Sequence, residues 1–169
     1  EMQQVLLIGD HKQLRPGVQC YELVKAYHLD VSFFERSLNN NVAFECLRTQ
    51  RRMRPAIARL VHPIYPELQD HPSCMGRDSV AGLCSNVHFV THSVAEVVDS
   101  DLRSPKNPHE REVMLLLTGL LIGLGYAPAR ITMLSAYVGQ LMFLKNALDQ
   151  CGMADVILTT VDAYQGEEN

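Results

Sequence analysis

Three short polar segments of the sequence hold residue types that could act on phosphate groups. The first, GDHKQLRP, follows the apolar run VLLIG and contains Asp10 and Gln13. A carboxylate at the end of a buried strand can position a metal-bound water or a helix N-terminus, and an amide three residues later can donate to and accept from a phosphate and its attacking water. The same residues also fit a capped turn with a solvated Gln13, because short polar loops are common.

The second segment, QRRMRP (50–55), places three arginines within four positions ahead of a predicted helix. The planar fork of donors and the permanent charge of arginine suit phosphoryl groups. A solvated basic helix start is the alternative reading. Cations at a helix N-terminus oppose the helix dipole, and this cost favours a functional role.

The third segment, TTVDAYQGEE (159–168), begins in a predicted strand and passes through Gln-Gly into two acids. Gly166 would let the backbone approach a ligand closely. A polar loop after a core strand is the alternative interpretation. Each of the three segments is a weak signal on its own.

The elements that must position these segments follow from hydrophobic periodicity. We predict strands at 4–9, 43–50, 86–92 and 130–137, a strand running into a loop at 154–166, and helices at 19–28, 31–39, 54–65, 109–124 and 138–150. Ser32 and Glu35 form a capping box at the second helix, and a proline opens the third. Residues 66–86 are predicted to be loop and 100–110 a polar linker. Strands alternating with helices of about 12 residues indicate βαβ units and a parallel α/β sheet.

Composition limits the functional classes. The 169 residues are 47% apolar and 20% charged, which is typical of a soluble globular protein. The net charge of −4 gives no global attraction to nucleic acid, so such binding needs a local basic surface. The arginines at 48, 51, 52, 54 and 59 provide one. Five cysteines without a CxxC pair predict inert thiols in a reduced intracellular protein. We expect that protein to be cytoplasmic rather than nuclear.

Several further observations concern membranes, metals and chain limits. The apolar stretch from Val113 is shorter than the roughly 20 residues of a membrane span, so we predict a buried helix and no membrane partner. Met133 and Met142 are predicted to fill the core.

His88 and His92 would lie roughly 13 Å apart on a strand, too far to share one ion, and no metal site is predicted. The abrupt start in a strand suggests a piece of a larger protein with no signal peptide.

Taken together, the segments GDHKQLRP, QRRMRP and TVDAYQGEE, with SAYVGQ between the last two, resemble the later motifs of superfamily 1 helicases of the Upf1-like group. The usual forms of those motifs are GDxxQLxP, QYRMxP and TVDxxQGxE. The segments LVHPIYPELQDHPSC, HFVTH, NPHEREV and ITMLSAYVGQ narrow the resemblance to the helicase core of the NFX1-type zinc finger-containing protein 1 family. The ordered set is specific and spans nearly the whole chain.

The resemblance implies an α/β fold, the RecA-like parallel sheet flanked by helices of a P-loop NTPase helicase lobe. Residues 1–49 would end the first RecA-like lobe, and 50–169 would form most of the second, truncated before the final arginine motif. ATP and Mg²⁺ are the implied cofactors, held mainly by a part of the first lobe that this chain lacks.

The resemblance also implies roles for single residues. Gln13 would sense the γ-phosphate and its water, Arg52 would act as the arginine finger, and Asp10 would support the catalytic loop. The implied nucleotide-binding set is Gln50, Arg51, Gly166 and Glu168, with Glu168 also in the catalytic set. Arg51 replaces the usual Tyr beside adenine; a guanidinium can also stack on a base, so adenine binding survives but nucleotide selectivity is open.

The implied partner is single-stranded RNA, with DNA as the alternative. Ser135, Tyr137 and Thr160 match positions at which the family contacts the strand's backbone, and Tyr137 could stack on a base. A Ser or Thr at a strand end is more often a turn former. The RNA preference rests on resemblance alone, because no reader of the 2′-hydroxyl can be identified.

The resulting hypothesis is an ATP-dependent helicase that translocates on or unwinds nucleic acid. One alternative is a helicase-like scaffold that binds RNA or protein without turnover, although retention of Gln13, Arg52 and Glu168 argues against it. Another is a helicase that powers a separate nuclease. The sequence has no GxxxxGK(S/T) loop. We therefore expect the 169-residue chain alone neither to bind ATP tightly nor to hydrolyse it.

Overall fold

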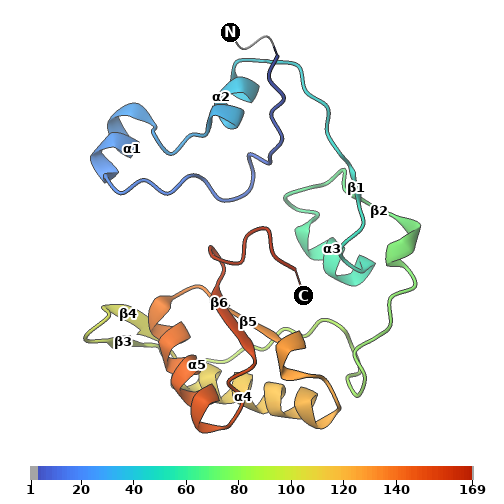
Figure 1. The fold of residues 1–169 in the computed structure, drawn as a ribbon, viewed down its shortest axis with the longest axis vertical. Coiled ribbons are helices and arrows are strands. Elements are labelled where there is room, and N and C mark those ends of the chain that lie inside the picture. Colours follow the sequence, from blue (N-terminus) through green and yellow to red (C-terminus); the bar gives the residue numbers. More distant parts are fainter. Residues whose placement is uncertain (1–3, 169) are drawn as a thin grey trace. The chain divides into compact units, whose positions relative to one another are not determined.

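Helices alternate with short strands along the computed structural model, which describes residues 4–168. The chain divides into two compact units, unit 1 (Glu1–Ser79) and unit 2 (Val80–Asn169). Figure 1 shows unit 1 in blue and green and unit 2 from yellow-green to red. The predicted lobe boundary between residues 49 and 50 stays a prediction.

The described residues of unit 1 form three short α-helices, one 3-10 helix and one pair of very short strands. Ser32 Oγ accepts a hydrogen bond from the backbone N–H of Glu35 at 3.0 Å, which confirms the predicted helix start. The Glu35 carboxylate instead accepts from Arg15 at 2.7 Å. The elements are α1 (Tyr21–Tyr27), α2 (Phe33–Asn39), β1 (Thr49–Gln50), α3 (Pro55–Val61), β2 (Gln69–Asp70) and a 3-10 helix (Pro72–Cys74).

The strands of unit 1 run parallel and hold the arginine-rich segment in place. Gln50 pairs with Asp70, and the Gln50 carbonyl accepts from the N–H of His71 at 2.9 Å. Beside this pair, Ala58 of α3 and Cys74 are almost completely buried. The segment between β1 and α3 is therefore fixed at both ends.

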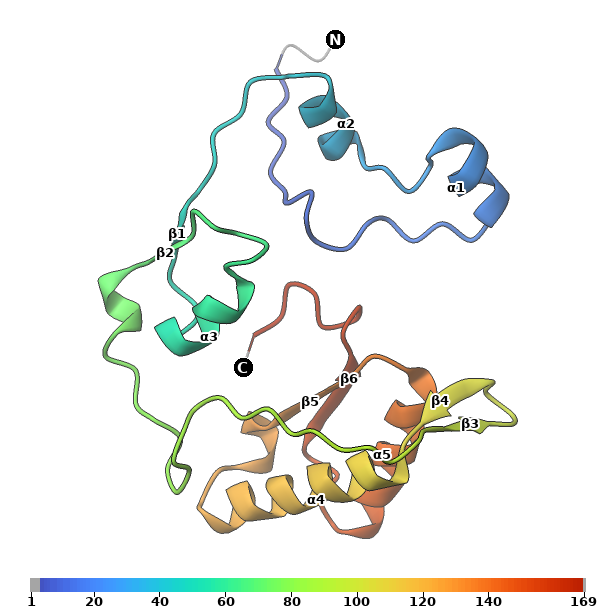
Figure 2. The same ribbon diagram turned by 180° about the vertical axis from the view of Figure 1, so that it is seen from behind.

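Unit 2 is built around a parallel βαβ arrangement, visible in Figures 1 and 2. β5 pairs with β6 from Thr132↔Ile157 to Ser135↔Thr160, and α5 connects them. The elements are β3 (Val97–Asp99), β4 (Ser104–Lys106), α4 (Pro108–Gly123), a 3-10 helix (Pro128–Arg130), β5 (Thr132–Ser135), α5 (Val138–Gln150) and β6 (Ile157–Thr160).

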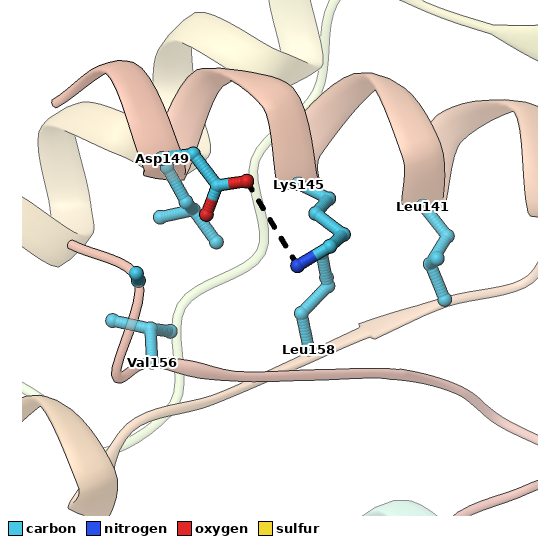
Figure 3. Close-up of a pocket in the computed structure, with 7 residues that line it drawn as sticks. Leu141, Lys145, Asp149, Val156 and Leu158 are labelled. Atoms are coloured by element: carbon cyan, nitrogen blue, oxygen red, sulfur yellow. Dashed lines mark ion pairs between the residues drawn. The ribbon is translucent and has the colours of Figure 1, made fainter. Parts of the chain in front are cut away.

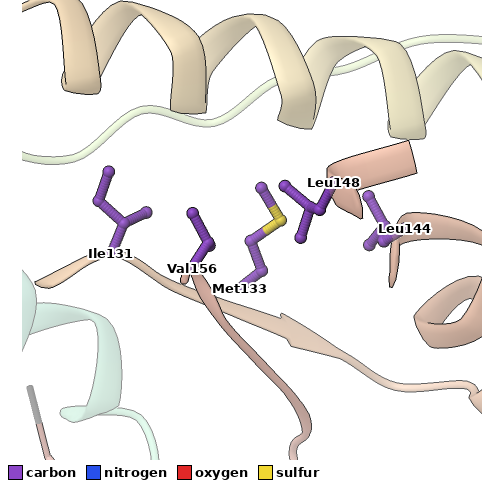
Figure 4. Packing of buried hydrophobic residues seen from close by; sticks show 5 residues of the cluster. All are labelled: Ile131, Met133, Leu144, Leu148 and Val156. Atoms are coloured by element: carbon purple, nitrogen blue, oxygen red, sulfur yellow. The ribbon is translucent and has the colours of Figure 1, made fainter. Parts of the chain in front are cut away.

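The core of unit 2 lies between the parallel strands and the two long helices. Figure 4 shows side chains from β5 and from the residues just before β5 and β6 meeting those of α5 beneath α4. The buried residues are Ile131, Met133, Leu144, Leu148 and Val156. Leu144 and Leu148 are one helical turn apart and share a face of α5. The apolar side of α4 covers the same cluster with Met114, Leu115, Leu121 and Ile122.

The antiparallel hairpin of β3 and β4 packs against the start of α5, as Figure 2 shows from behind. Gly139 permits this contact, because a Cβ atom there would lie 2.7 Å from the carbonyl oxygen of Ser104 and 2.9 Å from that of Pro105. The N–H of Gly139 donates to Ser104 Oγ at 2.9 Å. The Gln140 side chain accepts from the backbone N–H of Asn107 at 2.7 Å, which joins α5 to the start of α4.

The parallel α/β class with flanking helices is confirmed, but several local predictions are wrong. Residues 4–9 and 86–92 form no strand, because no described part of the chain pairs with them. The predicted linker 100–110 instead contains β4 and the first turn of α4. Met133 is buried as predicted, whereas Met142 is 41% exposed. No helix within residues 4–168 has the length and apolar character needed to cross a membrane.

Candidate nucleotide and nucleic-acid sites

The loop after the first apolar run is organised by the carboxylate of Asp10. Its Oδ1 accepts from the backbone N–H of Lys12 at 3.0 Å, and its Oδ2 accepts from Gln13 Nε2 at 3.0 Å. The N–H of Gln13 also donates to the Asp10 carbonyl at 3.3 Å, which closes a turn. Asp10 therefore both caps the turn and orients the Gln13 amide, so the two readings of this segment are compatible.

The same loop is tied to the segment that follows α3. The Tyr65 hydroxyl donates to Asp10 Oδ2 at 2.8 Å. The ammonium of Lys12 donates to the Ile64 carbonyl at 2.6 Å and lies 5.2 Å from the centre of the Tyr65 ring. These contacts join positions more than 50 residues apart in the sequence.

The protonation states of Asp10 and Tyr65 depend on burial and on the hydrogen bonds that each group makes. Burial acts to raise the pKa of the Asp10 carboxyl, but hydrogen bonds from Lys12, Tyr65 and Gln13, with the nearby His11, leave this pKa below its ordinary value. Burial and the hydrogen bond to the Asp10 carboxylate raise the pKa of Tyr65 to about 12. At neutral pH Asp10 is ionised and Tyr65 keeps its proton.

Gln50 shapes the turn that carries the arginines. Its Oε1 accepts from the N–H groups of Arg52 and Met53 at 2.9 and 2.7 Å. Its Nε2 donates to the Met53 carbonyl and to Asp70 Oδ1, both at 2.6 Å. The amide thus makes four hydrogen bonds within unit 1, and a predicted contact between Gln50 and nucleotide would have to displace one of them.

The arginines of this turn differ in their surroundings. Arg51 and Arg52 are exposed. The Arg51 carbonyl accepts from Arg77 at 2.9 Å, which fixes the backbone beneath the two guanidinium groups. Arg54 donates through Nη2 to the Asp78 carbonyl at 2.7 Å, while its buried Nη1 has no hydrogen-bond partner. The turn therefore presents two cations from a fixed backbone.

The predicted nucleic-acid contacts of unit 2 meet at one edge of the parallel strand pair. Ser135 ends β5, Thr160 ends β6, and the two residues are direct partners in the ladder. Ser135 is only 5% exposed. Its hydroxyl donates to the Tyr137 carbonyl at 2.9 Å and accepts from the Tyr137 N–H at 3.3 Å. Thr160 Oγ1 accepts from the N–H of Ala163 at 3.3 Å. Both hydroxyls thus form turns, as the alternative reading expects.

Tyr137 is the accessible member of this set. It precedes the first turn of α5 and is 52% exposed. Because its backbone is fixed by Ser135, the ring projects from a defined position at the carboxyl edge of β5. Ligands of open α/β sheets bind at this edge.

The last predicted segment is a series of turns that follows β6. Gly166 has a φ of +90°, a backbone conformation that disfavours a side chain. The N–H of Glu167 donates to the Tyr164 carbonyl at 3.0 Å. Glu168 is exposed at the end of these turns. Gly166 thus turns the chain and sets the direction in which Glu168 follows.

A small pocket in unit 2, drawn in Figure 3, lies between α5 and β6. Lys145 and Asp149 form an i,i+4 ion pair of 3.9 Å over mostly apolar lining. None of the predicted site residues lines this pocket within the described part of the chain. We therefore do not assign it to nucleotide or nucleic acid.

The predicted site residues form two groups. Unit 1 contains Asp10, Gln13, Gln50, Arg51 and Arg52, and unit 2 contains Ser135, Tyr137, Thr160, Gly166 and Glu168. Sequence reasoning missed Lys12 and Tyr65. The only signal for Tyr65 was its place in the PIYP segment, which suggested a family likeness but no role for the tyrosine.

The chain matches a known protein family and aligns with several longer proteins. Residues 29–169 match the family AAA_12, described as an AAA domain. The chain is 42% identical over 99% of its length to NFX1-type zinc finger-containing protein 1 of Mus musculus and 41% identical to that of Homo sapiens. It is 36% identical to the helicase required for RNAi-mediated heterochromatin assembly 1 of Schizosaccharomyces pombe, again over 99% of the chain.

The chain spans a small part of these relatives. It covers 9% of the mouse and human proteins and 17% of the fission yeast protein. The identities confirm the resemblance to NFX1-type and Upf1-like helicases over this segment.

Proposed function

The chain belongs to the AAA domain family AAA_12, and from this membership we propose that it is part of an ATP-dependent superfamily 1 helicase that moves on single-stranded RNA. The observation that carries the proposal is the content of unit 1. Two parts of the predicted nucleotide site, the oriented Gln13 amide and the turn with the exposed Arg51 and Arg52, lie in one compact unit. The proposal concerns a longer protein that contains this chain.

The Gln13 amide suits the role of a phosphate sensor. An ionised carboxylate only accepts hydrogen bonds, so the group that faces Asp10 must be Nε2. The Oε1 atom of Gln13 is thereby directed away from Asp10. This oxygen could accept a hydrogen bond from the attacking water. ATP supplies a γ-phosphoryl group whose transfer to water depends on positioning and charge stabilisation more than on covalent help.

Arg52 supplies the positive charge that this chemistry requires. Its backbone N–H is held by Gln50, so the side chain starts from a fixed point. A guanidinium offers several donors at once to the oxygens of a phosphoryl group. Arg51 presents a second planar cation from the same turn, which fits stacking on the base.

The described residues do not fit the role of primary Mg²⁺ ligands. Asp10 accepts three hydrogen bonds, which use most of the about four lone-pair positions of a carboxylate. Within residues 4–168, no three His, Cys, Asp or Glu side chains are grouped to hold a metal ion. We therefore assign Asp10 to the loop and the magnesium ligands to other parts of the longer protein.

The strand edge of unit 2 suits contact with a nucleic-acid backbone. Ser135 and Thr160 end adjacent parallel strands, and Tyr137 projects beside them. Backbone amides and an aromatic ring favour binding that does not depend on base sequence. The RNA preference is supported by the name of the fission yeast relative, which refers to RNAi.

The test is the ATPase rate of the longer protein, measured with and without single-stranded RNA or DNA. We expect stimulation by RNA, and a loss on the order of 10³-fold or more in Arg52→Ala, as for other arginine fingers. Arg130→Ala removes the same charge from an exposed position in the 3-10 helix of unit 2 and serves as the matched control. A rate at background with nucleic acid still bound would favour the scaffold function instead.

A further inference from the structure

The hydrogen bond between Tyr65 and Asp10 connects the two halves of the proposed phosphate site. Asp10 Oδ2 receives two donors, the Gln13 amide at 3.0 Å and the Tyr65 hydroxyl at 2.8 Å. The direction of the carboxylate therefore depends on Tyr65, and the direction of the Gln13 amide depends on the carboxylate.

Tyr65 is itself fixed by the helix that follows the arginine-rich turn. Its N–H donates to the Val61 carbonyl at 2.9 Å, which continues the last turn of α3. Its carbonyl accepts from the N–H of Leu68 at 3.1 Å. Pro55 begins α3 directly after Arg54, so a shift of the turn that carries Arg52 is transmitted along α3 to Tyr65.

Lys12 makes the connection a two-point contact. Its ammonium donates to the Ile64 carbonyl and lies over the Tyr65 ring. A single hydrogen bond would leave the loop free to rotate about it, whereas two separated contacts fix its orientation. The loop of residues 10–13 thus moves together with residues 64–65.

We propose that Tyr65 is a positioning residue for ATP hydrolysis, which through Asp10 holds the Gln13 amide in its working orientation and links it to the turn that bears Arg52. This inference rests on the proposed function. Tyr65 touches neither phosphate nor water in this role. It makes the sensor and the arginine turn respond to one another.

The test uses the longer protein and compares Tyr65→Phe with wild type. The variant keeps the ring beneath Lys12 and removes only the hydroxyl. We expect a fall in kcat on the order of 10-fold with KM for ATP unchanged, because an amide displaced by less than about 1 Å loses transition-state contacts rather than ground-state binding. Tyr21→Phe, at an exposed position in α1, is the matched control and should leave both constants unchanged.

A double-mutant cycle separates positioning from general weakening of the fold. In a Gln13→Ala background, Tyr65→Phe should have no further effect on kcat, because the amide that it positions is gone. Equal falls in kcat in both backgrounds would overturn the inference. A Tyr65→Phe protein with the same kcat as wild type would also overturn the inference. The proposed function would then stand, because the wild-type protein still hydrolyses ATP. A wild-type protein without turnover would overturn both.

Discussion

At the scale of the residue, the Asp10 carboxylate shows why part of the site could be predicted and part could not. Gln13 lies three residues from Asp10, so a turn brings them together and the spacing in the sequence indicates the contact. Tyr65 lies 55 residues away, and its approach depends on the path of the intervening chain. No local pattern distinguishes Tyr65 from the other tyrosines.

The raised pKa of Tyr65 predicts a pH-dependent stability. Its pKa rises from 10.0 to about 12 on folding, so the unfolded chain releases this proton first as the pH rises. The contribution of Tyr65 to the free energy of unfolding is therefore complete below pH 10.0 and is lost on the way to about pH 12. Urea unfolding of wild type and of Tyr65→Phe should show that the difference between their free energies of unfolding shrinks over this pH range.

Other contacts also weaken at alkaline pH, and they do so equally in wild type and in Tyr65→Phe. Subtracting the two free energies of unfolding cancels this common loss. Tyr21→Phe again provides the control, because Tyr21 is exposed in α1. The free energy of unfolding of Tyr21→Phe should stay close to that of wild type. A Tyr65→Phe difference that does not change between pH 10.0 and about 12 would contradict the contact with Asp10.

At the scale of the element, the packing of β4 on α5 predicts opposite effects for two helical glycines. Alanine is ordinarily preferred to glycine in a helix by about 1 kcal/mol. At Gly139 the added methyl would lie 2.7 Å from a backbone carbonyl, and we expect destabilisation of about 1–3 kcal/mol. At Gly119, in the middle of α4, nothing lies within 4 Å, and we expect stabilisation of up to about 1 kcal/mol.

Thermal and urea unfolding of the two alanine variants measure this contrast. Both substitutions add the same methyl group to an α-helix, so the local helix preference has the same sign in both. Two stabilised variants would mean that β4 yields readily and does not pack tightly on α5. Gly139→Ala alone should also loosen the hydrogen bond between its N–H and Ser104.

Helices were the more predictable elements because they complete their hydrogen bonds locally. The helix predicted at 138–150 has those bounds in the structure, and the helix predicted at 109–124 runs from Pro108 to Gly123. Asn107 caps the latter by accepting from the N–H groups of His109 and Glu110. Such starts depend on a few adjacent residues, which the sequence displays directly.

Strands were predicted less well because a strand also needs a partner. The run at 43–50 has suitable residues, but only Thr49 and Gln50 pair, opposite the two residues of β2. Val5, Leu6 and Ile8 have strand-forming side chains and remain largely exposed. Periodicity indicates which residues suit a strand, whereas pairing depends on segments far away in the chain.

At the scale of the whole molecule, we expect the isolated 169-residue chain to be inactive towards ATP. Its sequence has no phosphate-binding glycine loop, and its described residues present no group of metal ligands. Isothermal titration with Mg²⁺ and ATP should show no tight binding, and phosphate release should stay at background. Turnover that persists in the Gln13→Ala chain would point to a contaminating enzyme, whereas turnover that disappears with Gln13 would contradict the prediction.

The contact of Gly139 with β4 also makes the hairpin a useful reporter. Because backbone meets backbone there, with a hydrogen bond from Gly139 to Ser104, the hairpin and the first turn of α5 move as one body. A fluorescent dye attached at the exposed turn, for example at Asp101, would follow the reorientation of α5 without any change to Tyr137. Single-molecule energy transfer from that position would record any movement of α5 while the proposed nucleic-acid surface stays native.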